Sequence, residues 1–243
     1  RSVARSIADE ITRMVKASSG LDLLSKTTSG TILMIGYGVM GMHAAQHLKN
    51  KGCQAELIIA DQSLKKLSYA RQDGFKSIMS SFEEVLPFAD VIVLATNVIK
   101  NNSPVITADH FNIMKDEAVL TSMTSMDDEI RQDELIRQNI LKPLKNEHET
   151  MIYEGPNAKR FKFLLDGRPA NAGMSSGGTD EGICMIEAAG LVGAAKIAQF
   201  GLKANLEEED KEMISGLWLE HFHQLTNNYN TLVYVQNTFQ DKA

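Results

Sequence analysis

The chain has 243 residues, of which 43% are hydrophobic and 23% charged, and its formal net charge is −6. This length supports a sizeable core, in one large domain or in one domain with an appendage. The net charge leaves no basic excess to neutralise nucleic-acid phosphates, and no apolar run approaches the roughly 18 residues that a membrane span requires. The composition therefore argues against nucleic acid and membranes as partners. The two cysteines, Cys53 and Cys184, form no disulfide framework, which favours a reducing cytoplasm.

Residues 1–29 are expected to form an N-terminal helix and a linker. Apolar residues recur there at helical spacing, at Val3, Ile7, Ile11, Met14 and Val15. The stretches 18–20 and 26–30 are rich in Ser, Thr, Gly and Lys, as linkers are. The chain opens at Arg1 inside this helix without an initiator Met, so we expect a fragment or a processed product that lacks an upstream part.

From residue 30 onward, short apolar runs alternate with helical patterns. The expected strands are Thr31–Ile35, Glu56–Ala60, 75–79, 91–95 and Ala118–Ser122. The expected helices are 39–48, one capped by Ser63 that runs to Gln72, a short acidic one from Ser81 to Pro87, one capped by Thr107 or Asp109 that ends at Met114, and 127–139, whose first acids suit the helix dipole. This alternation predicts an α/β fold with a Rossmann-type, doubly wound parallel sheet.

The later segments complete the predicted organisation. Paired strands at 152–153 and 161–165 flank a turn at 155–157, and a long Ala-rich helix covers 181–200. We therefore expect a dinucleotide-binding domain at 30–200, flanked by the N-terminal helix and by a C-terminal helical tail at 201–243.

A glycine motif lies directly between the first strand and the following helix, in the sequence Gly36-Tyr37-Gly38-Val39-Met40-Gly41. In such a motif the first glycine permits a tight turn, the second lets the backbone approach a pyrophosphate, and the third lets the helix pack closely on the strand. The helix N-terminus then offers N–H groups and a partial positive charge to the phosphates. The alternative is a glycine-rich turn that binds nothing.

An acidic residue follows this motif at the spacing that ribose binding requires. Asp61, followed by Gln62, ends the second strand about 20–25 residues after the glycines, where a carboxylate binds ribose hydroxyls. Asp61 favours NAD over NADP, because it would repel a 2′-phosphate. Ser63 and Lys65 nearby would soften that preference.

Other candidate cofactor contacts follow later strands. Thr96 and Asn97 end the fourth strand, and Ser122, Met123 and Thr124 end the fifth, so these residues should face the crevice where ligands bind. Asn171 lies in a loop rich in small residues before the long helix. Simple loop-capping roles explain the hydroxyls equally well. No catalytic residue is assigned and no metal is expected, since His43 and His47 lack a third ligand nearby.

The chain from Arg1 to about Phe200 resembles the NAD-binding domain of the S-adenosyl-L-homocysteine hydrolase (adenosylhomocysteinase) family. The matching blocks are Ala-Asp-His-Phe at 108–111, Met-Lys-Asp at 114–116, Asp-Asp-Glu-Ile at 127–130, Lys142-Pro143, and Leu-Leu-Asp-Gly-Arg at 164–168 with Asn171 and Gly173. The resemblance implies a tightly held NAD that oxidises and then reduces a nucleoside 3′-hydroxyl, with a substrate domain that lies mostly upstream.

The sequence departs from this family where its chemistry is decided. Where the family has C-N-I-G-H-F-D, residues 121–127 are Thr-Ser-Met-Thr-Ser-Met-Asp, so the Asn and the Gly-His pair are absent. Gly177-Gly178-Thr179 replaces the family's G-H-P, and the tail lacks its K-P-D-H-Y-R-Y. The resemblance therefore supports cofactor binding better than hydrolase activity.

Three functions remain open from the sequence. The first is a nicotinamide-dependent oxidoreductase related to this family, with substrate groups supplied by a missing segment or a partner chain. The second is a dehydrogenase of another small metabolite, because a fold does not fix its chemistry. The third is a non-catalytic NAD-binding or structural module. We expect a homo-oligomer, or a partner chain that supplies the missing substrate domain.

Overall fold

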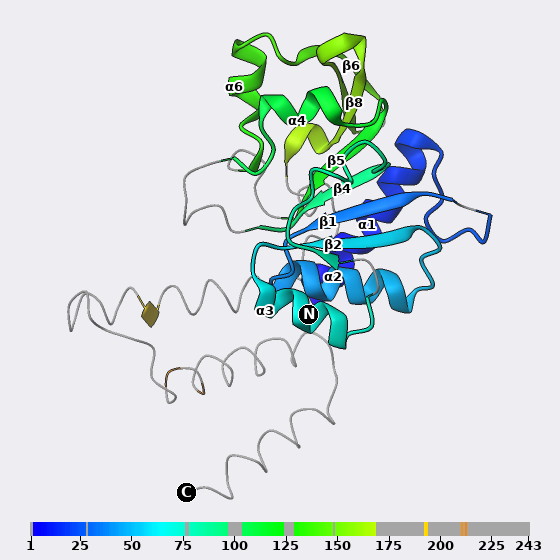
Figure 1. Cartoon of the computed structure of the whole chain (residues 1–243), viewed down its shortest axis with the longest axis vertical. Coiled ribbons are helices and arrows are strands. Elements are labelled where there is room, and N and C mark those ends of the chain that lie inside the picture. The colour runs from blue at the N-terminus through cyan, green and yellow to red at the C-terminus, as the bar shows by residue number, and fades with distance from the viewer. Residues whose placement is uncertain are drawn as a thin grey trace, which may run out of the picture. The chain divides into compact units, whose positions relative to one another are not determined.

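The computed structural model describes residues 2–27, 29–75, 78–96, 104–123, 129–147 and 149–168, with Val192, Gly193, Asp210 and Glu212 beyond them (Figure 1). The chain divides into two compact units, Arg1–Gly177 and Gly178–Ala243, and the fold below is that of the first. The helix expected at 181–200 and the expected C-terminal tail lie outside the described residues.

Helices and strands alternate through the first unit. The helices are α1 (Ser2–Ser19), α2 (Val39–Asn50), α3 (Leu64–Gln72), α4 (Ala108–Ile113) and α6 (Gln132–Arg137). The strands are β1 (Thr31–Ile35), β2 (Glu56–Ala60), β3 (Ile78–Met79), β4 (Val91–Leu94), β5 (Ala118–Ser122), β6 (Lys142–Glu147), β7 (Thr150–Glu154) and β8 (Arg160–Leu164). Within the described residues, no helix is long and apolar enough to cross a membrane.

The eight strands form one sheet in the order β3-β2-β1-β4-β5-β8-β7-β6. The pairs from β3 to β8 are parallel, whereas β7 is antiparallel to both β8 and β6. The Rossmann-like α/β fold is confirmed, but a wholly parallel sheet is not. The turn between β7 and β8 is too short for a crossover helix, and a short turn joins only antiparallel strands.

Helices cover both faces of the parallel part of the sheet. Side chains of α1, α2 and α3 pack on alternate strand residues such as Met34 and Val93. On the opposite face, Phe111 of α4 and Leu135 of α6 pack on Leu33 and on the other alternate residues. The central strands are therefore buried on both sides, which is why they are continuous apolar runs. In Figure 1, α4, α6, β6 and β8 gather at the end of the sheet away from α2 and α3.

Several predicted elements need correction. The acidic helix expected from Ser81 to Pro87 is a series of turns, in which the Ser81 hydroxyl donates to the carboxylate of Glu83. In the described part of 127–139, Glu129 is helical, the chain turns at Ile130, and a separate helix spans Gln132–Arg137. β3 is shorter than predicted, and β6 was not predicted. The fully exposed pattern of β6 explains the omission, because it has no alternation of apolar and polar residues.

The helix caps also differ in detail. Thr107 forms a capping box with His110 at the start of α4, as expected for one of the two candidate caps. Ser63 occupies the N-cap position of α3, but its side chain makes no capping hydrogen bond.

One buried hydroxyl in β5 lacks a hydrogen-bond partner among the described residues. Thr121 is fully buried and aligns with Val93 of β4, on the face that α1 covers, and no described residue hydrogen-bonds its Oγ1. The next residue, Ser122, is equally buried but donates to the carboxylate of Glu129 at 2.5 Å. Adjacent hydroxyls in one strand therefore differ in their energetic contribution.

We expect Thr121→Val to raise the free energy of unfolding by about 1 kcal/mol, because a buried hydroxyl that makes no hydrogen bond carries an uncompensated desolvation penalty. Ser122→Ala is the matched control and should lower it by roughly 1–3 kcal/mol. Urea denaturation measures both changes. Destabilisation by Thr121→Val together with no effect of Ser122→Ala would contradict this assignment.

Candidate functional site

The three glycines of the motif differ in what surrounds them. Gly36 has φ +104°, and a Cβ there would lie 2.5 Å from the carbonyl oxygen of Ala95. A Cβ on Gly41 would lie 2.0 Å from the carbonyl oxygen of Gly36. These two glycines are therefore required by the packing of the protein itself, since no side chain fits.

Gly38 is not required by packing. Its φ of −78° is available to any residue, and no described atom lies within 4 Å of an ideal Cβ on it. It is the N-cap of α2, whose first turn contains no acidic residue to compensate the partial positive charge of the helix end. The space beside Gly38 thus fits an anionic group that approaches the backbone closely, and a pyrophosphate has that character.

Asp61 connects the end of β2 to the glycine turn. Its Oδ2 accepts the N–H of Tyr37 at 2.8 Å and the Nζ of Lys66 at 3.2 Å, and its Oδ1 accepts the N–H of Ser63 at 2.8 Å. The carboxylate side chain is only 8% exposed. The expected basic neighbour, Lys65, instead lies over the ring of Tyr69.

The buried side chain of Tyr37 holds the glycine turn against the protein core. Its ring is buried and packs edge-on against Phe75, and its hydroxyl donates to Oδ2 of Asp73 at 2.7 Å. Burial and the nearby Asp73 carboxylate raise the pKa of the Tyr37 hydroxyl, so it remains a hydrogen-bond donor across the physiological range. The side chain of Tyr37 therefore fixes the turn and is not available to a ligand.

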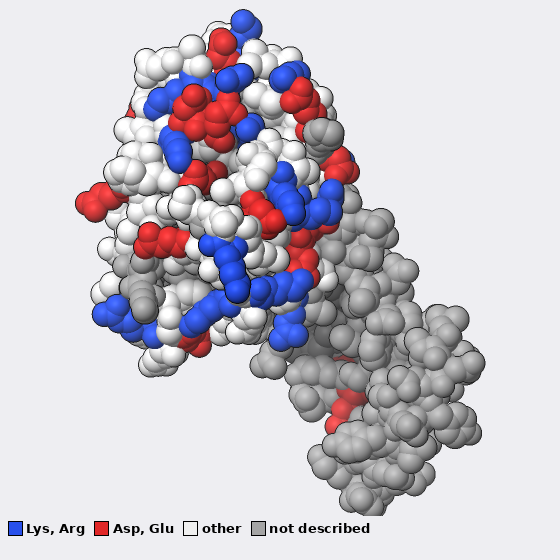
Figure 2. Space-filling view, turned by 90° about the vertical axis from the view of Figure 1, so that its right-hand side faces the viewer, with Lys and Arg blue, Asp and Glu red and all other residues white. Residues whose placement is uncertain are grey.

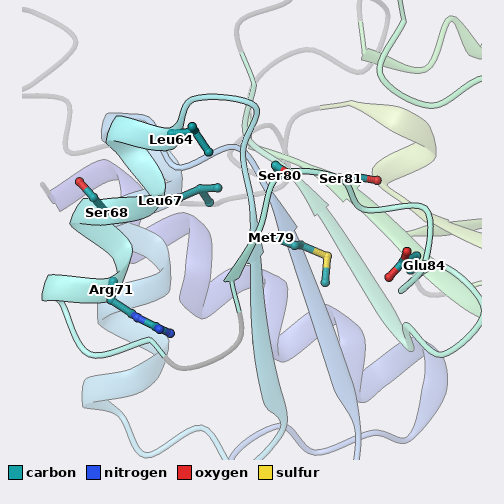
Figure 3. Close-up of a pocket in the computed structure, with 8 residues that line it drawn as sticks. All are labelled: Leu64, Leu67, Ser68, Arg71, Met79, Ser80, Ser81 and Glu84. Carbon is teal, nitrogen blue, oxygen red and sulfur yellow. The ribbon is translucent and has the colours of Figure 1, made fainter.

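A groove of about 660 Å³ runs beside Asp61 between α3 and the segment after β3 (Figure 3). Leu64, Leu67, Ser68 and Arg71 of α3 line one side, and Met79, Ser80, Ser81 and Glu84 line the other. The main chain of Asp61 contacts one lining residue, because its N–H donates to the carbonyl oxygen of Met79. Leu64 is 75% exposed at its edge, and Val39 at the start of α2 is 70% exposed. Gln62, the other residue predicted here, is exposed.

The ends of β4 and β5 meet at a residue that was not predicted as part of the site. Glu129 is buried, and its Oε1 accepts both the N–H and the hydroxyl of Thr96, at 2.8 and 2.6 Å. Its Oε2 accepts the hydroxyl of Ser122. The hydroxyls of Thr96 and Ser122 thus donate to a protein carboxylate. Met123 is also buried.

The sequence contained one signal for Glu129, the Asp-Asp-Glu-Ile block at 127–130. Those acids were interpreted as partners of a helix dipole. In the structure Glu129 precedes α6 and its carboxylate is directed to the strand ends. Asn97, Thr124 and Asn171, also predicted to contact the cofactor, lie outside the described residues.

Charges on the surface are mixed in sign. In the upper part of the face in Figure 2, Lys and Arg lie beside Asp and Glu, whereas Lys and Arg predominate in a band lower on it. Ion pairs join opposite charges on the protein surface, for example between Glu117 and both Arg160 and Lys162. His47 pairs with Asp9 of α1 at 2.9 Å. Among the described residues, no group of three His, Cys, Asp or Glu could hold a metal ion.

Comparison with protein families agrees with this geometry. The model of the S-adenosyl-L-homocysteine hydrolase NAD-binding domain matches residues 3–177. The chain belongs to this family. The family is described as an NAD-binding domain, and the glycine turn and Asp61 both lie within the match.

Individual relatives of this NAD-binding domain cover different shares of the chain. An adenosylhomocysteinase of Pyrococcus abyssi (strain GE5 / Orsay) is 31% identical over 142 residues, which are 58% of this chain and 31% of that protein. The chain therefore matches about a third of that relative. An L-alanine dehydrogenase structure superposes with a TM-score of 0.56 over 83% of this chain and 54% of its own, at 20% identity, which supports the fold alone.

We expect Gly41→Ala to lower the free energy of unfolding by about 2 kcal/mol or more, because its Cβ would overlap the Gly36 carbonyl oxygen. Gly38→Ala should change it by less than about 0.5 kcal/mol, since the new methyl group meets open space. Urea denaturation of the two variants provides the comparison. Equal losses of stability would mean that Gly38 also serves packing.

Proposed function

We propose that this chain binds NAD at the carboxyl ends of β1, β2 and β4, with the pyrophosphate against the backbone at Gly38. The observation that carries the proposal is the contrast between the glycines. Gly36 and Gly41 are explained by contacts within the protein, whereas the backbone at Gly38 faces space at the positive end of α2. A dinucleotide binding there would contact the N–H groups of the first turn of α2.

Asp61 is the proposed ribose ligand on the adenosine side. Its carboxylate lies within hydrogen-bond distance of the glycine turn, and after accepting Tyr37, Lys66 and Ser63 it keeps a lone pair on Oδ1 for a ribose hydroxyl. A bound adenosine would cover Leu64, whose apolar side chain is otherwise in water. A 2′-phosphate would meet the negative charge of Asp61, although Lys66 partly offsets it. NAD is therefore proposed over NADP.

The proposed activity is a nicotinamide-dependent oxidoreduction of a small molecule, in which NAD would supply the hydride acceptor. At the ends of β4 and β5, the hydroxyls of Thr96 and Ser122 donate to Glu129, whose carboxylate is buried, so we do not assign a proton acceptor for a substrate hydroxyl among these residues. The groups that bind substrate and accept its proton are proposed to come from outside the described residues, from this chain or a partner. A coupled assay with candidate alcohols, followed at the absorbance of reduced nicotinamide, tests the activity.

A non-catalytic NAD-binding module is the second candidate. It is favoured by Ser122 and Met123, which replace the Asn-Ile of the family's C-N-I block, and by the donation of the Ser122 hydroxyl to Glu129. NAD binding without any reduction of the cofactor over a broad substrate panel would support this second candidate.

Gly38→Val should weaken NAD binding by about 100-fold or more, because the side chain would occupy the space proposed for the pyrophosphate. Isothermal titration calorimetry measures the affinity, and the unfolding temperature checks that the fold is retained. Unchanged affinity in a folded variant would remove the pyrophosphate from this position.

Asp61→Ser should weaken NAD and shift the preference toward NADP by roughly 1–3 kcal/mol, by removing a ribose hydrogen bond and a negative charge. Asp73→Ser is the matched control, since Asp73 also supports Tyr37 but lies at the far end of α3. The ratio of the two dissociation constants is the measured quantity. An unchanged ratio in Asp61→Ser would show that Asp61 does not bind the ribose.

A further inference from the structure

Glu129 joins three segments at the carboxyl edge of the sheet. Its carboxylate accepts the N–H and hydroxyl of Thr96, directly after β4, and the hydroxyl of Ser122, the last residue of β5. Its main-chain oxygen accepts the N–H groups of Val105 and Ile106, at 2.7 and 3.0 Å, just before α4. One residue therefore holds both ends of the β4–α4 connection and the end of β5.

Because this carboxylate is buried, losing one of its hydrogen bonds would be costly. Glu129 is 1% exposed, and a buried carboxylate is tolerated only when donors surround it. The three donors are 2.5–2.8 Å from its oxygens, which is typical of hydrogen bonds to a charged acceptor. The positions of Thr96 and Ser122 are consequently coupled to each other through Glu129.

These segments lie beside the glycine turn, on the side away from Asp61. A Cβ on Gly36 would be 3.1 Å from the N–H nitrogen of Thr96, so the turn and the end of β4 are in direct contact. The strand order places β2 on one side of β1, and β4 then β5 on the other. A dinucleotide whose adenosine lies over β2 must therefore place its other half over β4 and β5.

We propose that Glu129 is a positioning residue for the nicotinamide half of the cofactor. It acts through Thr96 and the end of β5 rather than by touching the ring, because its oxygens accept hydrogen bonds from those residues. The inference rests on the proposed NAD binding. It predicts that loss of the carboxylate impairs recognition of nicotinamide while the adenosine and pyrophosphate contacts persist.

The test compares NAD⁺ with ADP-ribose, which keeps the adenosine, the pyrophosphate and the second ribose but lacks nicotinamide. Calorimetry on the full chain should show that the wild type binds NAD⁺ more tightly than ADP-ribose. In Glu129→Gln, which keeps size but loses charge, this preference should fall about tenfold while ADP-ribose affinity stays within about twofold. Glu129→Asp, which restores the charge, should recover part of the preference.

Glu134→Gln is the matched control, because Glu134 is about half exposed in α6 and should leave both affinities unchanged. If Glu129→Gln does not fold, Ser122→Ala carries the same test, since it removes one donor and leaves the carboxylate. A wild type that binds neither ligand would overturn the proposed function. Binding of both ligands, with an equal loss or no loss in the Glu129 variant, or no preference in the wild type, would overturn the role of Glu129 alone.

Discussion

Main-chain atoms of three segments approach one another at Gly36, and the position of the site depends on this contact. The turn after β1 lies against the carbonyl of Ala95 at the end of β4, and its own carbonyl lies against Gly41 in α2. Side chains at either glycine would separate these segments. The approach directs the N-terminus of α2, with its N–H groups, toward the carboxyl edge of the sheet, where we propose that the pyrophosphate binds.

Buried or partly buried carboxylates then hold neighbouring strands in register at their ends. Asp61, after β2, accepts the N–H of Tyr37 after β1, and Glu129 accepts the N–H of Thr96 after β4. At the opposite edge, Asp90 before β4 accepts the N–H of Thr31 at the start of β1. In each case a charged acceptor satisfies an N–H at a strand end that the ladder does not satisfy. The shared chemistry places polar groups at both edges of an otherwise apolar sheet.

The two halves of the site are organised differently. On the β2 side, the N–H of Asp61 donates to the carbonyl oxygen of Met79, which lines the groove, and the exposed side chain of Leu64 lies at the edge of that groove. On the β4 and β5 side, the carboxylate of Glu129 is buried behind the residues that it holds. In the proposed binding mode, separate carboxylates would support the adenosine and nicotinamide halves of the cofactor.

The sequence by itself determined the central strands, the helices α1 to α4 and the glycine turn with Asp61. These signals are local: an apolar run bounded by glycines, helical spacing, and residues at fixed distances along the chain. β1, β2 and β5 have the predicted bounds, because strands buried on both faces show continuous apolar runs. The exposed edge strand β6 shows no such pattern, and the turn at 83–88 resembled an acidic helix because its composition is compatible with either.

Only the tertiary structure distinguished Gly38 from its two neighbours in the motif, because the difference lies in contacts with Ala95 and with the turn itself. It also determined the contacts of Glu129, which is 33 residues from Thr96 and 7 from Ser122. Sequence spacing does not reveal which donors a buried carboxylate will meet. The donors that Glu129 meets are determined by the order of strands in the sheet, because that order brings the ends of β4 and β5 side by side, next to its carboxylate.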